Sequence, residues 1–179
     1  MRSAVDVARR CLCLELLAQR SVLEQDDAAD ADTVRATWAS RVGDLGITLT
    51  SEESAFMERG VGKLTEDERD DLDGRSTGAA VLLWALGRTS TKPTFANADE
   101  LVAEHGLLND GSIAKAKAAA ENASLRGEAE LDTALSGFLR ARGKAKDPSD
   151  PEQIYAGVAA HHLTWILTDT MSFDDDIDL

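Results

Sequence analysis

The chain has 179 residues, and its 33 Asp and Glu outnumber its 19 Lys and Arg to give a formal net charge of −14 at pH 7. This charge argues against nucleic acid and against an anionic membrane as partners, because both are bound by clustered Lys and Arg. It fits a basic protein partner, which it would attract over a distance, and it equally fits a surface that serves only solubility.

The composition predicts an all-α protein. Aromatic residues make up 4% of the chain, whereas Ala and Leu, which favour helices, are abundant. The length predicts a single domain over residues 1–179, with a core that needs neither metal nor disulfide. No apolar run approaches the length of about 20 residues that crosses a bilayer.

The cysteine usage predicts a cytoplasmic protein. Cys11 and Cys13 are the only cysteines, and at positions i and i+2 of a helix they point to different sides, which disfavours a bond between them. Two free thiols fit a reducing compartment. Charged residues interrupt every apolar run near the N-terminus, so we expect no signal peptide.

Helical periodicity with start and stop signals predicts about seven to nine helices and no strand. Thr65 and Glu68 give the clearest start signal, a capping box, and Asn97 is expected to cap a later helix in the same way. Asp150 followed by Pro151 is typical of a helix start. The predicted helices cover residues 3–24, 33–42, 51–57, 65–73, 75–86, 98–105, 110–125, 128–142 and 151–167.

The spacing of apolar residues predicts which positions of these helices are buried. Three tryptophans are expected in or near the core: Trp38, Trp84 and Trp165. The predicted buried stripes include Ala8, Leu12 and Leu16 in 3–24, Leu131, Leu135, Phe138 and Leu139 in 128–142, and Ile154, Val158, His162 and Trp165 in 151–167.

The stretch RSTGAAVLLWALGR, residues 75–88, is expected to form the central helix of the fold. All side chains from Ala79 to Leu86 are apolar, so a helix here has no polar face for solvent and must be buried. Whether it continues the preceding helix through Gly74 or kinks there stays open from the sequence.

This stretch, together with ASLRGEAELDTAL (123–135) and HHLTWILTDTMSFDDDIDL (161–179), resembles a bacterial family called domain of unknown function 4272. The resemblance spans roughly residues 5–179 and implies the fold of that family; its name implies no activity. Members tend to carry Trp and Glu around the shared Arg, where Gly74 and Thr77 stand here. They also tend to carry a Glu-Arg pair where Val158 and Ala159 stand, so Arg75 alone remains of these polar positions.

Arg75 is a candidate binding residue. Its guanidinium suits the bidentate binding of a carboxylate or a phosphate. The alternative is a structural ion pair with one of the carboxylates that precede it, Asp70, Asp71 or Asp73.

His161 and His162 are the second candidates. Adjacent helical residues diverge by about 100°, so the pair is not suited to chelating one metal, and a zinc site would need one of them together with carboxylates. The alternative is that His162 is a core histidine with a hydrogen-bonded ring and that His161 is exposed.

Asp174, Asp175 and Asp176 lie in an acidic C-terminal tail, residues 171–179. Carboxylates suit hard cations such as calcium or magnesium. The spacing, glycine and terminal glutamate of a calcium loop are missing, however, so a solvated terminus is the competing interpretation.

Two functions remain open. Because no nucleophile elbow, phosphate loop or dinucleotide fingerprint occurs, we predict no catalytic residue, no metal and no cofactor. The first hypothesis is therefore a non-enzymatic protein-binding module, for instance an inhibitor or immunity-type partner of a basic toxin or effector. The alternative is an enzyme or a small-ligand or metal-binding protein, with a pocket formed by Arg75, His161 or His162 and carboxylates. The sequence leaves the oligomeric state open.

Overall fold

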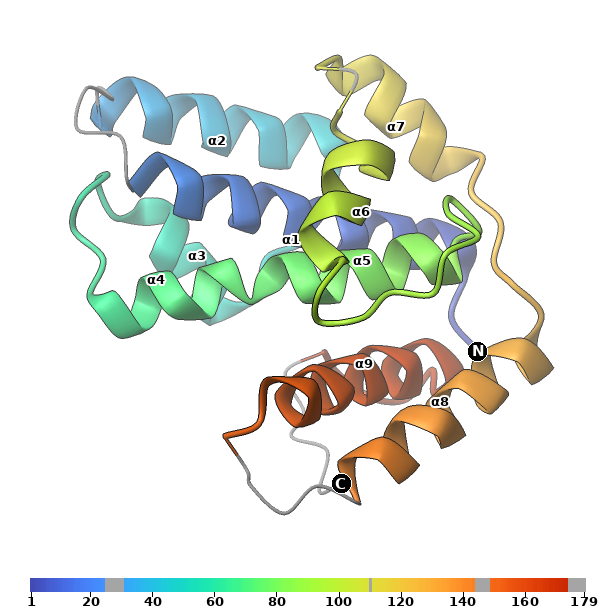
Figure 1. The fold of residues 1–179 in the computed structure, drawn as a ribbon. Helices are drawn as coiled ribbons and strands as arrows, with labels where there is room; N and C mark the ends of the chain where they lie inside the picture. Colours follow the sequence, from blue (N-terminus) through green and yellow to red (C-terminus); the bar gives the residue numbers. More distant parts are fainter. Residues whose placement is uncertain (25–30, 110, 144–148, 174–179) are drawn as a thin grey trace.

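The computed structural model describes residues 1–24, 31–109, 111–143 and 149–173, and within these ranges all regular secondary structure is α-helical (Figure 1). This confirms the all-α fold class. The helices are α1 (Ala4–Glu24), α2 (Ala31–Leu45), α3 (Ser51–Glu58), α4 (Glu66–Asp73), α5 (Arg75–Ala85), α6 (Ala98–His105), α7 (Ile113–Glu121), α8 (Glu128–Arg142) and α9 (Pro151–Leu167). In the described ranges no helix is long and apolar enough to cross a membrane.

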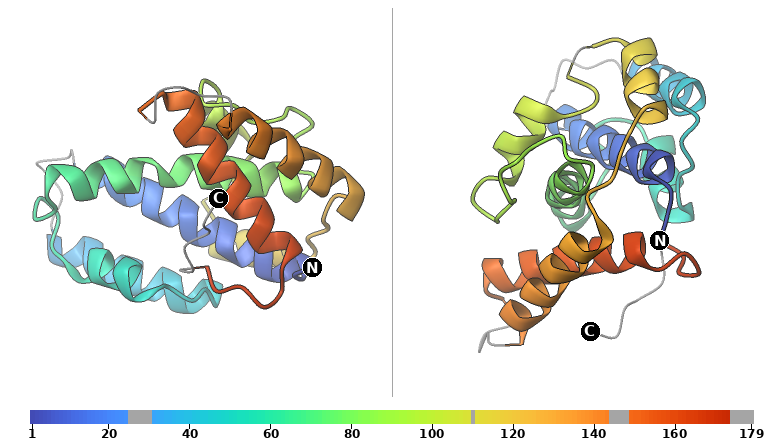
Figure 2. Two further views of the ribbon diagram at one scale, coloured as in Figure 1. Left: turned by 90° about the horizontal axis from the view of Figure 1, so that it is seen from below. Right: turned by 90° about the vertical axis from the view of Figure 1, so that its right-hand side faces the viewer.

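Two helices form the centre of the fold. α1 and α5 lie side by side in the views of Figures 1 and 2 and pack along one another. α4 and α7 pack on α1, whereas α6 and α9 pack on α5. α2 and α3 contact each other on the far side of α1, and α8 pairs with α9 as a hairpin at the opposite edge.

The burial of α5 confirms its predicted central position. Every residue from Gly78 to Leu86 is buried, as expected for a helix that is apolar on all sides. α1 is enclosed to the same extent, because every residue from Arg10 to Leu17 is also buried. The burial of α1 on all sides could not be predicted from its sequence, because the helix contains charged residues. Their side chains are nevertheless buried: Arg10, Glu15, Arg20 and Glu24.

The helix starts at Thr65 and Asp150 form as predicted. Thr65 Oγ1 accepts a hydrogen bond from the Glu68 amide at 3.3 Å, and a Glu68 carboxylate oxygen accepts one from the Thr65 amide at 2.9 Å. Asp150 Oδ1 accepts from the Glu152 amide at 3.0 Å. These side chains use backbone donors that have no partner inside the helix.

The predicted cap at Asn97 is wrong. α6 begins after Asn97, but the Asn97 side chain makes no capping bond. Its Oδ1 accepts instead from the Thr94 amide at 2.7 Å in the preceding turn. α7 is also shorter than the predicted 110–125, because Asn122 Nδ2 donates to the Ala118 carbonyl at 2.8 Å where the helix ends.

The outer face of the α8–α9 hairpin includes residues that were predicted to be buried. Leu139 is 38% exposed and Ile154 is 55% exposed, so both predictions of burial are wrong. The two helices meet instead through Phe138 and Tyr155, whose rings pack edge to face with centroids 5.8 Å apart. A hairpin at the edge of the fold buries only part of each apolar stripe, because solvent covers its outer side.

The start of the chain is bound to the last helix. The Arg2 amide donates to the Ile166 carbonyl at 2.8 Å, and Arg2 Nε donates to the Trp165 carbonyl at 2.9 Å. The Arg2 guanidinium also lies 4.4 Å from the centre of the Trp165 ring, a cation–π distance. These contacts hold the N-terminal end of α1 against the C-terminal end of α9 (Figure 2).

The linker between α4 and α5 is one residue. Gly74 has helical dihedral angles of φ −61° and ψ −16°, so α4 leads into α5 with no loop between them (Figure 1). The chain thus passes through Gly74 from one helix directly into the next. Arg75 therefore stands at the junction between an acidic helix and an apolar one.

Candidate functional site

Arg75, the first residue of α5, is engaged in an ion pair. Its Nη2 donates to Asp71 Oδ2 at 2.9 Å one helical turn earlier. A second carboxylate, Glu52 on α3, lies 3.8 Å from the same nitrogen. The structural ion pair raised by the sequence is therefore present, and the binding of an external carboxylate or phosphate by Arg75 stays a prediction.

His162 lies in the interior between α9 and α5. Its side chain is 6% exposed, and its Nδ1 lies 2.8 Å from the Val158 carbonyl, which makes Nδ1 the protonated nitrogen. Nε2 faces Gly78 of α5 and has no hydrogen-bond partner among the described residues. Burial lowers the pKa of His162 to about 3, so the ring is neutral. This is the core histidine with a hydrogen-bonded ring that the sequence suggested.

His161 is half-buried, which corrects the expectation that it is exposed. Phe173, from the segment that follows α9, folds back over the helix, and its ring centroid lies 5.2 Å from those of both His161 and His162. The Phe173 ring also packs edge-on against Trp165 at 5.5 Å. No pattern in the sequence indicates this fold-back, so the covering of His161 could not be predicted.

A buried ion pair lies beneath Phe173. Arg10 of α1 donates through Nη1 and Nη2 to the two carboxylate oxygens of Glu53 at 2.8 and 2.5 Å. The Arg10 and Glu53 side chains are 7% and 1% exposed. The Phe173 ring covers the Arg10 guanidinium at 3.4 Å. His162 lies near this ion pair, because the Phe173 ring contacts both the His162 ring and the Arg10 guanidinium. Burial lowers the pKa of His162, and the positive charges of Arg10 and Arg75 add to this effect.

Sequence reasoning missed both members of the pair, although one signal was present. Thr50 and Glu53 have the spacing of a capping box, and the structure shows both of its hydrogen bonds. That signal would have placed Glu53 at the start of α3. It would not have revealed Arg10, which lies 43 residues earlier in the chain.

The chemistry of this cluster is that of packing rather than of nucleophilic attack. Burial raises the pKa of the Cys13 thiol to about 12, against the opposing charge of Arg10. Burial also raises the pKa of Cys11, and both thiols are free, as predicted. Protonated thiols are poor nucleophiles. Burial alone would raise the pKa of Glu53, but the hydrogen bonds and charge of Arg10 outweigh it and lower this pKa, so the carboxylate is ionised.

The other predicted residues, Asp174, Asp175 and Asp176, lie outside the described residues. Within the described part of the chain, no group of three His, Cys, Asp or Glu side chains is placed as metal ligands would be. The acidic tail therefore stays a prediction, both as a cation site and as a solvated terminus.

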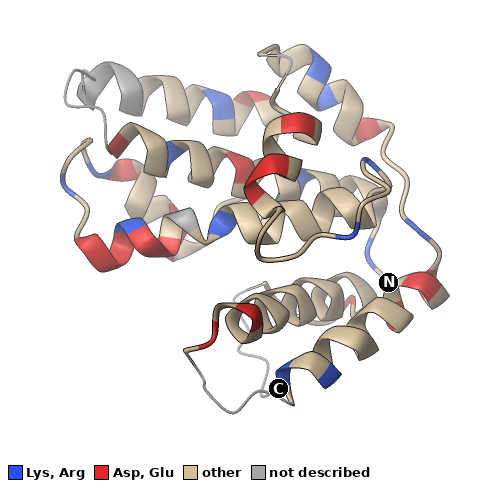
Figure 3. Cartoon of the chain, in the orientation of Figure 1, with Lys and Arg blue, Asp and Glu red and all other residues tan. Residues whose placement is uncertain are grey.

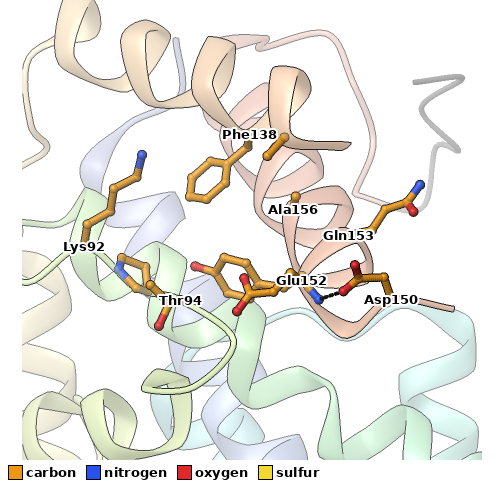
Figure 4. A pocket seen from close by; sticks show the side chains of 10 residues that line it. Lys92, Thr94, Phe138, Asp150, Glu152, Gln153 and Ala156 are labelled. Carbon is orange, nitrogen blue, oxygen red and sulfur yellow. Dashed lines mark hydrogen bonds between the residues drawn. The ribbon is translucent and has the colours of Figure 1, made fainter. Parts of the chain in front are cut away.

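Two of the clefts on the described surface lie away from this cluster. One, the α1–α6 groove, has a volume of about 490 Å³ and lies between α1 and α6, and Ser76 of α5 and Asn109 also line it. The other, the α9 cleft, has a volume of about 430 Å³ and lies between the loop before α6, the end of α8 and the start of α9 (Figure 4). Arg75, His161 and His162 are absent from both described linings.

The walls of the α1–α6 groove are apolar, and its charges are negative. Ala18 and Val22 of α1 face Val102 and Ala103 of α6. Val22 is 67% exposed, which is unusual for a branched apolar side chain on a helix whose middle, from Arg10 to Leu17, is buried. The charged side chains that line the described groove are both carboxylates: Glu15 and Asp99.

Glu15 fixes the floor of the groove. Its two carboxylate oxygens accept hydrogen bonds from the Leu107 and Leu108 amides, each at 2.9 Å. Burial raises the pKa of Glu15, although these backbone hydrogen bonds act in the opposite direction. The segment after α6 is thereby bound to α1, which sets the spacing of the groove walls. Nothing in the sequence marked Glu15, because its partners lie 92 and 93 residues away.

The helix that forms one wall of the groove, α6, is acidic, and one of its carboxylates, Asp99, lines the groove. α6 carries Asp99, Glu100 and Glu104, all exposed, and no Lys or Arg. Figure 3 shows these acidic positions on α6, which crosses in front of α1, and a second acidic group along α4. Carboxylates beside apolar walls suit a partner group that is itself part apolar and part cationic.

The chain matches a family model over nearly all of its length. The family model described as Domain of unknown function (DUF4272) matches residues 1–175. No curated protein and no solved structure matches the chain significantly. The matched range includes the Arg10–Glu53 pair and the α1–α6 groove.

Proposed function

The chain belongs to the family described as Domain of unknown function (DUF4272), and from its structure we propose that it is a non-enzymatic protein-binding module. The proposal places a basic segment of another protein in the α1–α6 groove. The observation that carries it is the pairing of apolar walls with carboxylates as the charged groups of the described lining.

A Lys or Arg side chain matches this lining in both of its parts. Its methylene stem can pack on Val22 and Val102, while its charged end reaches the Asp99 carboxylate. The rest of the protein also favours such a partner, because a net charge of −14 attracts a basic protein over a distance.

The buried cluster around Arg10 supports the non-enzymatic form of the proposal. Arg10 and Glu53 bind one another, and the thiols beside them are protonated. These buried side chains thus join α1 to α3 and, through Phe173, to the segment that follows α9. An inhibitor or immunity-type partner of a basic toxin or effector is the specific form of this function that we propose.

The direct test measures binding to short fluorescent peptides by anisotropy. A peptide of alternating Leu and Lys should bind, and the peptide with Glu in place of Lys should not. The affinity for the Leu-Lys peptide should fall steeply with added salt, because exposed charges are screened. Asp99→Asn should weaken it by about tenfold, the effect of roughly 1.4 kcal/mol.

Two matched variants serve as controls. Asp132→Asn makes the same charge change on the exposed face of α8 and should leave the affinity unaltered. Ala103→Arg places a cation in the groove and should abolish binding, whereas Ala129→Arg on α8 should not. If the Leu-Glu peptide binds as well as the Leu-Lys peptide, or if neither binds, the proposal is wrong.

The natural partner can be identified at the same site. A photo-crosslinking amino acid at residue 103, inside the groove, is compared in the producing organism with one at residue 129 on α8. Adducts formed only from residue 103 should map to basic segments of one protein. Adducts that map to acidic segments would contradict the proposed partner class.

A further inference from the structure

The proposed binding in the α1–α6 groove does not involve the α9 cleft. The α9 cleft has the chemistry of a small-molecule site. We propose that it binds a free amino acid with an aromatic or other large apolar side chain. The inference rests on a cation and a carboxylate that line one cleft and form no ion pair within the described residues, together with apolar surface and a buried hydroxyl.

The cleft is formed by three separate elements. The loop before α6 supplies Lys92 and Thr94, α8 supplies Phe138, and α9 supplies Glu152 and Ala156 (Figure 4). Its volume of about 430 Å³ lies within the range of about 300–1,000 Å³ that is typical of small-ligand pockets. The free ligand must therefore be small and partly apolar.

The charged side chains of the described lining are Lys92, from the loop before α6, and two carboxylates at the start of α9, Asp150 and Glu152. Asp150 is engaged in capping α9, where its Oδ1 accepts from the Glu152 amide. Lys92 Nζ lies 4.3 Å from the centre of the Phe138 ring, and Lys92 forms no ion pair with any described residue. Glu152, in the first turn of α9, is exposed and likewise forms no ion pair within the described part of the chain. Figure 4 shows Lys92 entering from the loop and Glu152 from α9. A ligand that carries both charges matches such a pair better than a simple amine or acid does.

Tyr155 supplies a polar group that the protein itself leaves unsatisfied. The side chain is 3% exposed, and its hydroxyl is buried without a hydrogen-bond partner among the described residues. Burial, with a contribution from Glu152, raises the pKa of Tyr155, so the hydroxyl remains protonated and available as a donor. A buried donor without a partner is unfavourable, and a ligand carboxylate would satisfy it.

These groups assign a position to each part of the ligand. The carboxylate lies toward Lys92 and the Tyr155 hydroxyl, and the ammonium group lies toward Glu152. The side chain packs on the Phe138 ring and on Pro93, which also lines the cleft. A free amino acid carries both charges, whereas a peptide terminus offers only one of them.

Three compounds that share a phenyl group test the assignment by calorimetry. L-phenylalanine carries both charges, phenethylamine lacks the carboxylate, and 3-phenylpropionate lacks the ammonium group. L-phenylalanine should bind at least about tenfold more tightly than either of the others. Amide chemical shifts should change at Lys92, at Thr94 and at residues 152–156, and not at the α1–α6 groove.

Charge-removing variants connect each end of the ligand to its residue. Lys92→Met should weaken L-phenylalanine binding by about tenfold and leave phenethylamine unaffected, since only the former has a carboxylate. Glu152→Gln should weaken the binding of L-phenylalanine and leave the binding of 3-phenylpropionate unaffected. Lys117→Met and Glu121→Gln, exposed positions on α7, are the matched controls and should change nothing.

Tyr155→Phe removes only the hydroxyl and should weaken the binding of L-phenylalanine. The melting temperature of the variant is measured to confirm that it folds. Equal binding of all three compounds would reduce the cleft to a non-specific apolar surface and overturn the inference. Absence of binding at millimolar concentration would also overturn it. L-phenylalanine should not displace the Leu-Lys peptide, so this inference and the proposed protein-binding function succeed or fail separately.

Discussion

The imidazole of His162 lies so close to Gly78 that a Cβ atom at residue 78 would come within 2.4 Å of Nε2 and 2.7 Å of Cε1. On the other side, Leu14 Cδ1 would lie 3.0 Å away. Gly78 is thus enclosed between α9 and α1 in the middle of α5. The missing side chain allows α9 to approach α5 closely, which is a use of glycine that does not depend on its backbone freedom.

We expect Gly78→Ala to destabilise the protein by about 1–3 kcal/mol, because the added methyl group must displace a packed imidazole. Urea unfolding measures this directly. A loss of 1 kcal/mol also corresponds to a fall of roughly 2–4 °C in melting temperature for a chain of this size.

Gly43→Ala is the matched control. Gly43 lies within α2, and a Cβ there meets nothing within 4 Å. Alanine should stabilise the helix at this position by about 0.5–1 kcal/mol. The two substitutions should therefore have opposite signs, and a stabilising effect of both would show that His162 does not restrict residue 78.

His162 should make stability depend on pH. Burial lowers its pKa to about 3, and the nearby charges of His161, Arg10 and Arg75 add to this, although the hydrogen bond to Val158 opposes it. Between pH 6.5 and 3 the unfolded chain therefore binds one more proton at this residue than the folded chain does. The contribution of His162 should fall by about 1.4 kcal/mol for each pH unit below 6.5.

The comparison with His162→Asn isolates this effect. Asn retains a donor for the Val158 carbonyl but does not titrate, so the difference in unfolding free energy between the two proteins should shrink as the pH falls from 7 to 4. Glu15, whose pKa is raised, has the opposite sign, because its contribution is present at low pH and is lost as the pH rises through its folded pKa. Glu15 is common to both proteins and cancels. A difference that does not vary with pH would contradict a neutral, buried imidazole.

The Arg10–Glu53 pair should show strong energetic coupling. Arg10→Met or Glu53→Leu alone should cost about 3–5 kcal/mol, because each leaves a buried partner without its counterpart. Arg10→Met combined with Glu53→Leu should cost much less than the sum of the single changes, which a double-mutant cycle by urea unfolding would measure. Additive effects would show that the two side chains do not depend on one another.

Trp84→Ala should cost about 3–5 kcal/mol, the usual range for truncating a packed aromatic side chain. Trp84 is 5% exposed, and the Arg126 guanidinium lies 4.7 Å from the centre of its ring. Trp84→Phe, which keeps an aromatic ring, should cost distinctly less. A melting temperature for Trp84→Ala close to that of the unaltered protein would show that α5 is not a central element of the core.

The sequence by itself determined the helices and the burial of α5. The starts at Thr65 and Asp150 depend on side chains within three residues of the backbone groups they bind, and the burial of α5 follows from an unbroken apolar run. Such features are local, so neighbouring residues specify them. The same reasoning located Arg75 and His162 as residues of interest, since each is a polar side chain beside or within an apolar helix.

Only the tertiary structure decided the partners of the buried charges and the shapes of the clefts. Arg10 and Glu53, and Glu15 with the Leu107 amide, are joined across 43 and 92 residues by the packing of helices. The burial of α1 and the covering of His161 by Phe173 arise in the same way. A charged residue has the same local pattern whether it faces solvent or a distant partner. Its role is therefore fixed only when the helices that carry both members are packed together.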